Sequence, residues 1–214
     1  YSLNYSIMKK LLLSVMLFLF GLTTSLNAQS VEVVIGSGDD YVHCESPTAL
    51  FYNYSFSQMI YTADEINQEN GFIASIAFRM HDNSYVRNFA IYMQNTDKES
   101  FVNESDYVAV ATEDLVFEGS VNLGSSSNGW VTIELTTPFK YNGGNLLVTL
   151  DDNTGYYEDN LYFYHYPASA DLKRTISAYT DTYNLTYENA ADYSDYSFNP
   201  TSKGYYIAPQ VKFD

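Results

Sequence analysis

The sequence GWVTIELTTPFKYNGGNLLVTLDDNTG, from Gly129 to Gly155, decides the fold. It holds a run with recurring apolar residues, Trp130–Leu135, and a shorter apolar burst, Leu146–Leu150. The tetrapeptide Asn142-Gly143-Gly144-Asn145 lies between them, and Asn and Gly are the residues that turns between strands prefer. We therefore expect two strands here, with three side chains in the core: Trp130, Ile133 and Leu135.

Short apolar or alternating runs, each bounded by Gly, Asn, Asp or Pro, occur along the rest of the chain. They predict strands near 31–35, 58–61, 72–81, 87–94, 107–110, 115–121, 130–135, 145–150, 161–166, 174–179 and 206–213. The content of 22 Tyr and 13 Phe, with abundant Val, Ile and Thr, is typical of β-sheet proteins. Because the strands are short and closely spaced, we expect an all-β antiparallel sandwich of about ten strands.

Local signals add one helix, one hairpin and one long loop to this prediction. Thr62 and Glu65 form a capping box, which predicts a helix of one or two turns before Asn70-Gly71. Asn128-Gly129 predicts a hairpin that joins the strand ending near Val121 to Trp130 through the Ser-rich segment 124–129. The segment Tyr183–Gly204 is rich in Tyr, Asp, Asn and Ser and has no apolar period, so it reads as a long loop.

The N-terminal segment Met8–Ala28 reads as a secretory signal peptide. Lys9 and Lys10 give it a positive start, the apolar run Leu11–Leu22 follows, and small or polar residues lead to cleavage after Ala28. The apolar run is too short to span a bilayer, which takes about 20 residues, and the alternative is a buried N-terminal helix. We expect residues 29–214 to be a single secreted or cell-surface domain, cut from a longer multidomain protein, with residues 1–7 as upstream sequence.

The composition limits the partners of this domain. There are 10 Lys and Arg against 26 Asp and Glu, a net charge of −16, and the leader contributes no acid. Such a charge repels phosphate backbones, which argues against nucleic acid as a partner. The single cysteine, Cys44, cannot form an internal disulfide, so the fold depends on its core.

Several segments resemble a known family. Phe51–Gln58, Ile60–Ile66, Gly71–Phe78, Gly129–Ile133 and Asp151–Gly155 look like a module of secreted Bacteroidetes proteins, and the likeness covers most of 51–155. The module is similar to the jelly-roll adhesin domains found beside surface proteases and haemagglutinins. This resemblance implies a jelly-roll sandwich and a role in adhesion, and it supplies no catalytic motif.

Asp151, Asp152 and Asn153 are candidate calcium ligands. They follow a buried strand on a turn, and closely spaced oxygen atoms suit Ca²⁺, which takes 6–8 of them. The alternative is a plain turn, since Asp, Asn and Gly favour turns without any metal.

Five tyrosines are candidates for binding a ligand. Tyr162, Tyr164 and Tyr166 alternate with Leu161, Phe163 and His165, so the three tyrosines share one face of a strand, with Tyr156 and Tyr157 nearby. A row of rings beside carboxylates suits sugar binding. The alternative is an ordinary sheet whose tyrosines pack with their hydroxyls at the rim.

No catalytic motif is visible. The three histidines, His43, His81 and His165, are far apart, and the chain has no Gly-x-Ser-x-Gly or His-Glu-x-x-His. Paired carboxylates for glycoside hydrolysis depend on separations in space, which a sequence does not give. We expect no enzyme. We expect a secreted, non-catalytic adhesion or interaction module that contacts a host or environmental glycan or glycoprotein, or alternatively a carbohydrate-binding module beside a secreted enzyme.

Overall fold

A computed structural model describes residues 30–39, 46–81, 85–125, 129–158, 162–190 and 201–214, of which 125 and 201–204 are described by their backbone alone. The predicted signal peptide, His43 and Cys44 lie outside these ranges. The residues Glu32–Asp214 form one compact unit. No helix within the described ranges has the length and hydropathy that a membrane span requires.

The described chain consists mainly of short strands. Two helices of four residues, α2 (Ala63–Ile66) and α3 (Tyr187–Ala190), and two 3-10 turns, η1 (Thr112–Asp114) and η2 (Leu123–Ser125), interrupt them. The strands are β1 (Val33–Ile35), β2 (Tyr54–Tyr61), β3 (Gly71–Arg79), β4 (Val86–Thr96), β5 (Leu115–Asn122), β6 (Trp130–Tyr141), β7 (Asn145–Asp152), β8 (His165–Tyr166), β9 (Thr175–Thr180), β10 (Thr201–Tyr205), β11 (Ala208–Pro209) and β12 (Val211–Phe213).

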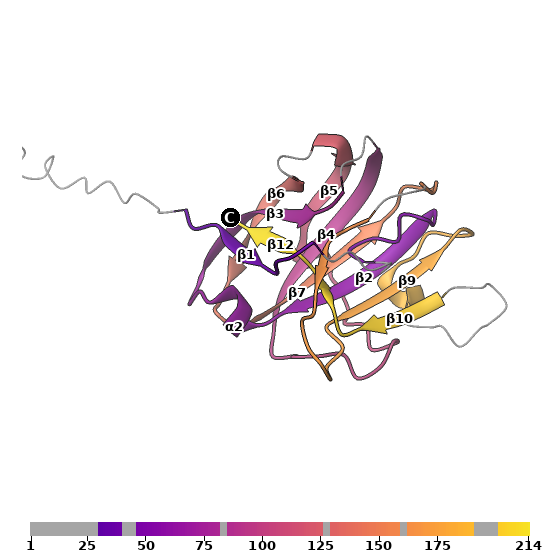
Figure 1. Cartoon of the computed structure of the whole chain (residues 1–214). Coiled ribbons are helices and arrows are strands. Elements are labelled where there is room, and N and C mark those ends of the chain that lie inside the picture. Colours follow the sequence, from indigo (N-terminus) through magenta and orange to yellow (C-terminus); the bar gives the residue numbers. More distant parts are fainter. Residues whose placement is uncertain (1–29, 40–45, 82–84, 126–128, 159–161, 191–200) are drawn as a thin grey trace, which may run out of the picture. The chain divides into compact units, whose positions relative to one another are not determined.

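The strands form an antiparallel jelly-roll sandwich. A four-stranded sheet has the order β1-β12-β3-β6, and a six-stranded sheet has the order β10-β9-β2-β7-β4-β5 (Figure 1). The chain crosses between the sheets at every step from β1 to β4, makes the β4-β5 hairpin, and crosses again to β6 and back to β7. This is the double winding of a jelly roll, so the predicted fold is confirmed; β9 and β10 widen the second sheet.

Apolar side chains are buried on both faces of the six-stranded sheet. The main core lies between the two sheets and includes Met59, Ile76, Ile91 and Leu150. A second cluster covers the outer face of the six-stranded sheet, where Phe56, Ile60, Leu147 and Ile176 lie beneath two covering segments. These segments supply Phe101 and Tyr107 from the long β4–β5 connection and Leu185 and Ala190 from the α3 region.

The predicted helix is α2. The side chain of Thr62 accepts a hydrogen bond from Glu65 N–H, and Glu65 Oε2 accepts one from Thr62 N–H at 2.8 Å, which completes the capping box. Asn67 ends the helix in the left-handed conformation at φ 50°, ahead of the predicted stop at Asn70-Gly71.

Three local predictions were wrong. Asn128 lies outside the described residues, but β5 and β6 do not form the predicted hairpin, because they belong to different sheets. Residues 107–110 are not a strand; Gln58 binds this segment through Val108 N–H and Val108 C=O, both at 2.7 Å, and holds it over the outer face. Trp130 is half-buried on the outward side of β6, while Val131, Ile133 and Leu135 point into the core.

The reading of Tyr183–Gly204 as a loop was also wrong in part. The helix α3 and most of the strand β10 lie within it, and β10 pairs with β9 from Thr201 opposite Tyr179. The predicted strand at 161–166 shrinks in the described part to β8 and an isolated bridge at Phe163.

Candidate ligand-binding site

A pocket of about 280 Å³ opens on the outer face of the six-stranded sheet. Strands β2, β4 and β7 form its floor, and the segment before β5 and the α3 region form its walls. Its lining residues are Phe56, Tyr92, Val110, Ala111, Thr112, Leu115, Asp151, Thr186, Tyr187 and Glu188.

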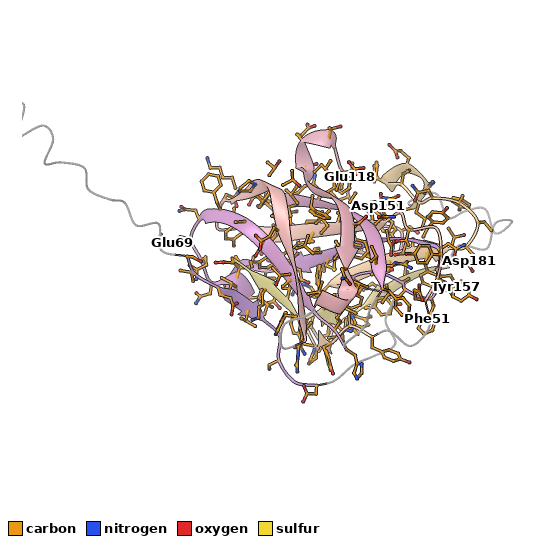
Figure 2. The ribbon with its side chains drawn as sticks, turned by 90° about the horizontal axis from the view of Figure 1, so that it is seen from above. Phe51, Glu69, Glu118, Asp151, Tyr157 and Asp181 are labelled. Atoms are coloured by element: carbon orange, nitrogen blue, oxygen red, sulfur yellow. The ribbon has the colours of Figure 1, made fainter. Side chains whose placement is uncertain are left out.

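The register of the strands places two carboxylates on this face. Asp151 of β7 lies opposite Phe56 of β2 and opposite Ala90 of β4, and Ala90 lies opposite Glu118 of β5. Residues in one cross-strand row share a face, so Asp151 and Glu118 stand on the same face with the small Ala90 between them. Figure 2 shows the two acidic side chains close together.

Asp151 is the most unusual side chain of the pocket. It is only 7% exposed, and its Oδ1 has no hydrogen-bond partner in the described part of the structure. Burial raises the pKa of Asp151 to about 7; the carboxylates of Asp152 and Glu118 add to this rise, and a side-chain hydrogen bond with Asn153 opposes it. A buried oxygen without a partner is costly, and such groups cluster where ligands bind.

Tyr92 connects the floor of the pocket to its walls. Burial raises the pKa of its hydroxyl, and the carboxylates of Asp151, Glu118 and Glu188 raise it further. These three acids come from β7, β5 and α3, so three separate elements direct negative charge towards one ring. Tyr187 stands on α3 and is half-buried against the second apolar cluster.

Two glutamines hold the covering segment in place beside the pocket. Gln58 binds both backbone groups of Val108, and Gln94 donates to Ala109 C=O at 3.1 Å and to Asp114 Oδ2 at 2.9 Å. The wall at 110–112 is therefore fixed to the sheet by side-chain bonds. A fixed wall favours a preformed site, as most small-molecule pockets are.

The three predicted calcium ligands are divided between two faces of β7 and its end. Asp152 points into the sandwich, where its Oδ2 accepts hydrogen bonds from Arg87 Nε at 2.9 Å and Nη2 at 2.6 Å, and both side chains are fully buried. Thr48 Oγ1 also donates to Oδ2, and Thr154 to Oδ1. Asp151 points to the outer face, and Asn153, which follows the end of β7, forms a side-chain hydrogen bond with it. Calcium binding by the three residues stays a prediction.

Tyr156 and Tyr157 lie outside the pocket at one end of the sandwich. Their segment runs beside the chain before β2, with Gly155 N–H donating to Asn53 C=O and Glu158 N–H to Leu50 C=O. Phe51 and Tyr157 are exposed there and lie on the same edge of the molecule (Figure 2). The hydroxyl of Tyr156 donates to Val86 C=O at 2.6 Å.

Tyr162, Tyr164 and Tyr166 are half-buried, and they alternate with the buried Phe163 and His165 in the predicted sense. The Arg79 guanidinium lies 4.5 Å from the centre of the Tyr164 ring. The Tyr166 hydroxyl donates to Glu65 Oε1 at 2.8 Å, and burial raises its pKa well above the ordinary value. Tyr164 and Tyr166 thus contact the protein itself, and none of the three lines the pocket.

Of the predicted site residues, the pocket contains only Asp151. The lining residues Tyr92, Tyr187 and Glu188 were not predicted, and neither was Glu118, which stands beside the lining in the row of Asp151. They come from β4, α3 and β5, and only the fold brings them together. The spacing of Ala90 and Tyr92 was a signal for part of the site, because residues two apart in a strand lie on the same face, and both belong to the predicted strand 87–94.

The chain was compared with protein-family models, with curated proteins and with solved structures. None of the three comparisons finds a match. Within the described ranges, no group of three or more His, Cys, Asp or Glu side chains is arranged to hold a metal ion.

Proposed function

We propose that this chain is a non-catalytic adhesion or interaction module of a secreted or cell-surface protein, and that it binds carbohydrate in the outer-face pocket. The observation that carries the proposal is the buried Asp151, whose Oδ1 has no partner in the described structure and which lines a pocket with Tyr92 and Tyr187. The resemblance to secreted jelly-roll adhesin domains supplies the setting.

The lining suits a ligand rich in hydroxyl groups. Tyrosine offers a flat apolar ring and a hydroxyl that both donates and accepts hydrogen bonds. Thr112 and Thr186 add two more hydroxyls to the walls, and Glu188 adds acceptor oxygens. A volume of about 280 Å³ lies near the lower end for ligand pockets, which suits one sugar ring at a chain end better than a long polymer segment.

The test is titration calorimetry of the protein against a panel of monosaccharides, with two tyrosine variants. Tyr187→Ala should weaken binding at least tenfold, because it removes one wall of the pocket. Tyr157→Ala is the matched control: it removes an exposed ring outside the pocket and should leave the affinity unchanged. Loss of binding in Tyr157→Ala alone would move the site to the exposed aromatic edge, and absence of binding to every sugar would reject the carbohydrate proposal.

A further inference from the structure

We propose that the outer-face pocket selects ligands that carry a primary ammonium group, so that among sugars it takes an amino sugar with a free amine. This inference rests on the proposed function and names its substrate class. It depends on the charges around the pocket, on the buried oxygen at its floor and on the mixture of rings and hydroxyls in its walls.

All the ionised side chains of the site carry the same sign. Asp151 and Glu188 line the pocket, and Glu118 stands in the same cross-strand row as Asp151. Tyr92 and Tyr187 are the other titratable groups that face it, and Asp152 lies behind on the inner face of β7. Among the lining residues that the structure describes there is no Lys, Arg or His, so the pocket attracts cations and repels anions.

Asp151 supplies the anchor for such a cation. Its Oδ1 is buried and has no protein partner in the described ranges, so it can accept a hydrogen bond that the fold does not supply. An ammonium group has three N–H donors, and charge-assisted hydrogen bonds to a carboxylate are stronger than neutral ones. The rings of Tyr92 and Tyr187 can also contact a cation through their faces.

A bare metal ion suits the same charges less well. Calcium requires 6–8 oxygen ligands within about 2.6 Å, and the described acidic residues form no group that could hold a metal. The carboxylates are instead spread over β5, β7 and α3 around an open space. That arrangement fits an organic cation with a body of its own, and hydroxyl groups on that body match the hydroxyls of Thr112 and Thr186.

The experiment compares four probes by calorimetry: D-glucosamine, D-glucose, N-acetyl-D-glucosamine and n-butylamine. We expect glucosamine to bind at least tenfold more tightly than glucose or the acetylated sugar, which lack the charge. Asp151→Asn should remove this preference, and Glu118→Gln should reduce it. Glu134→Gln is the control, because it removes one exposed acid from β6 in the other sheet and should change nothing.

n-Butylamine gives a second readout, because it carries the ammonium group without a sugar. Asp151→Asn should weaken its binding at least tenfold, because the variant lacks the carboxylate at the floor of the pocket. Glu134→Gln should leave its binding unchanged. Equal binding of butylamine to the parent protein and to Asp151→Asn would contradict the inference.

The outcomes separate the inference from the proposed function. Equal binding of glucose and glucosamine would overturn the amine preference and leave the carbohydrate function in place. Binding of butylamine without any sugar would support the amine site, overturn the carbohydrate function, and point to a lysine side chain of a protein as the source of the amine. Binding of none of the four would overturn both.

Discussion

Asp151 and Asp152 are adjacent in β7 but occupy opposite environments. Asp152 is fully buried inside the sandwich, where two nitrogens of Arg87 and the hydroxyls of Thr48 and Thr154 bind its oxygens. Asp151 faces outward into the pocket, where the nearest charges are acidic. Because adjacent side chains of a strand point to opposite faces, Asp152 forms a structural ion pair while Asp151 lies at the centre of the candidate site.

This difference predicts that the substitution of Asp by Asn has opposite effects on stability at positions 151 and 152. The pKa of Asp151 is about 7 in the folded protein, whereas an unperturbed aspartate has a pKa of 3.8, so the folded protein disfavours the ionised form. Its contribution to the free energy of unfolding therefore falls as the pH rises from about 4 to about 7, by roughly 1.4 kcal/mol for each unit of pKa difference. Asp151→Asn should raise the melting temperature at pH 8 and change it little at pH 4.

Asp152→Asn is the comparison for this melt. Breaking a buried ion pair leaves the charge of Arg87 without its counterion, which costs about 3–5 kcal/mol. We expect a large loss of stability at pH 8, where Asp151→Asn is stabilising. If Asp151→Asn lowered the melting temperature at pH 8, a contact within the fold would have to stabilise the ionised carboxylate of Asp151, which would contradict this prediction.

Trp130 shows what a sequence can say about one residue and where it stops. Its place at the start of an apolar run predicted burial, but the alternation of Val131, Ile133 and Leu135 fixes the inner face of β6 and puts Trp130 on the other. There the ammonium of Lys212 from β12 lies 4.7 Å from its ring centre. The sequence shows that β6 is an apolar strand, but it does not show that Trp130 packs against Lys212, because that partner lies about 80 residues away in the chain.

At the scale of elements, the connection between β6 and β7 depends on Gly143. Its φ is +91°, a conformation that favours glycine, and an added Cβ would overlap the carbonyl oxygen of Glu69. Gly143→Ala should therefore destabilise the protein by about 2 kcal/mol or more, measured by denaturant unfolding, because it combines backbone strain with a clash against backbone.

Gly71→Ala is the matched control. Gly71 begins β3 with an ordinary φ, and a Cβ there would meet nothing within 4 Å. We expect a change within about 0.5 kcal/mol. Equal losses in both variants would show that the turn at Gly143 adapts to a side chain.

The same elements show which predictions from sequence succeed. The capping box of Thr62 and Glu65 is a local pattern, and its helix formed where predicted. The Asn128-Gly129 signal marked the boundary of β6 but not its partner, because a turn residue sets a local backbone angle while pairing is decided by which apolar faces meet. The start of β6 was therefore readable, whereas the crossing from β5 to β6 between sheets was not.

At the scale of the whole molecule, the candidate site is assembled from distant parts. Tyr92, Glu118, Asp151 and Tyr187 come from β4, β5, β7 and α3, and only the jelly-roll winding brings them to one face. Asp151 was singled out from the sequence because acidic turn residues are conspicuous, although for a different ligand. No spacing within the chain encodes the other three, since their proximity depends on strand order.

The same winding joins the two ends of the domain. β12 lies between β1 and β3 in the four-stranded sheet, and in the described structure β1 pairs with β12 alone (Figure 1, yellow beside indigo). Val211 and Phe213 of β12 are almost fully buried in the main core, whereas β1 is an edge strand that buries Ile35. The buried strand β12 therefore holds the edge strand β1 in place.

Two deletions test whether β1 depends on β12 more than β12 depends on β1. Removal of residues 211–214 should abolish cooperative thermal unfolding, because it opens the edge of β3, exposes the core beneath Val211 and Phe213, and leaves β1 without a partner. Removal of residues 30–35 should preserve a cooperative transition at a lower temperature, since β12 keeps its pairing with β3. Circular dichroism melts of both proteins distinguish the cases. β1 and β12 have three residues each, so a difference between the deletions reflects their positions in the sheet and their burial, and not their lengths. A sharp transition in the first deletion, or its loss in the second, would contradict the central role of β12.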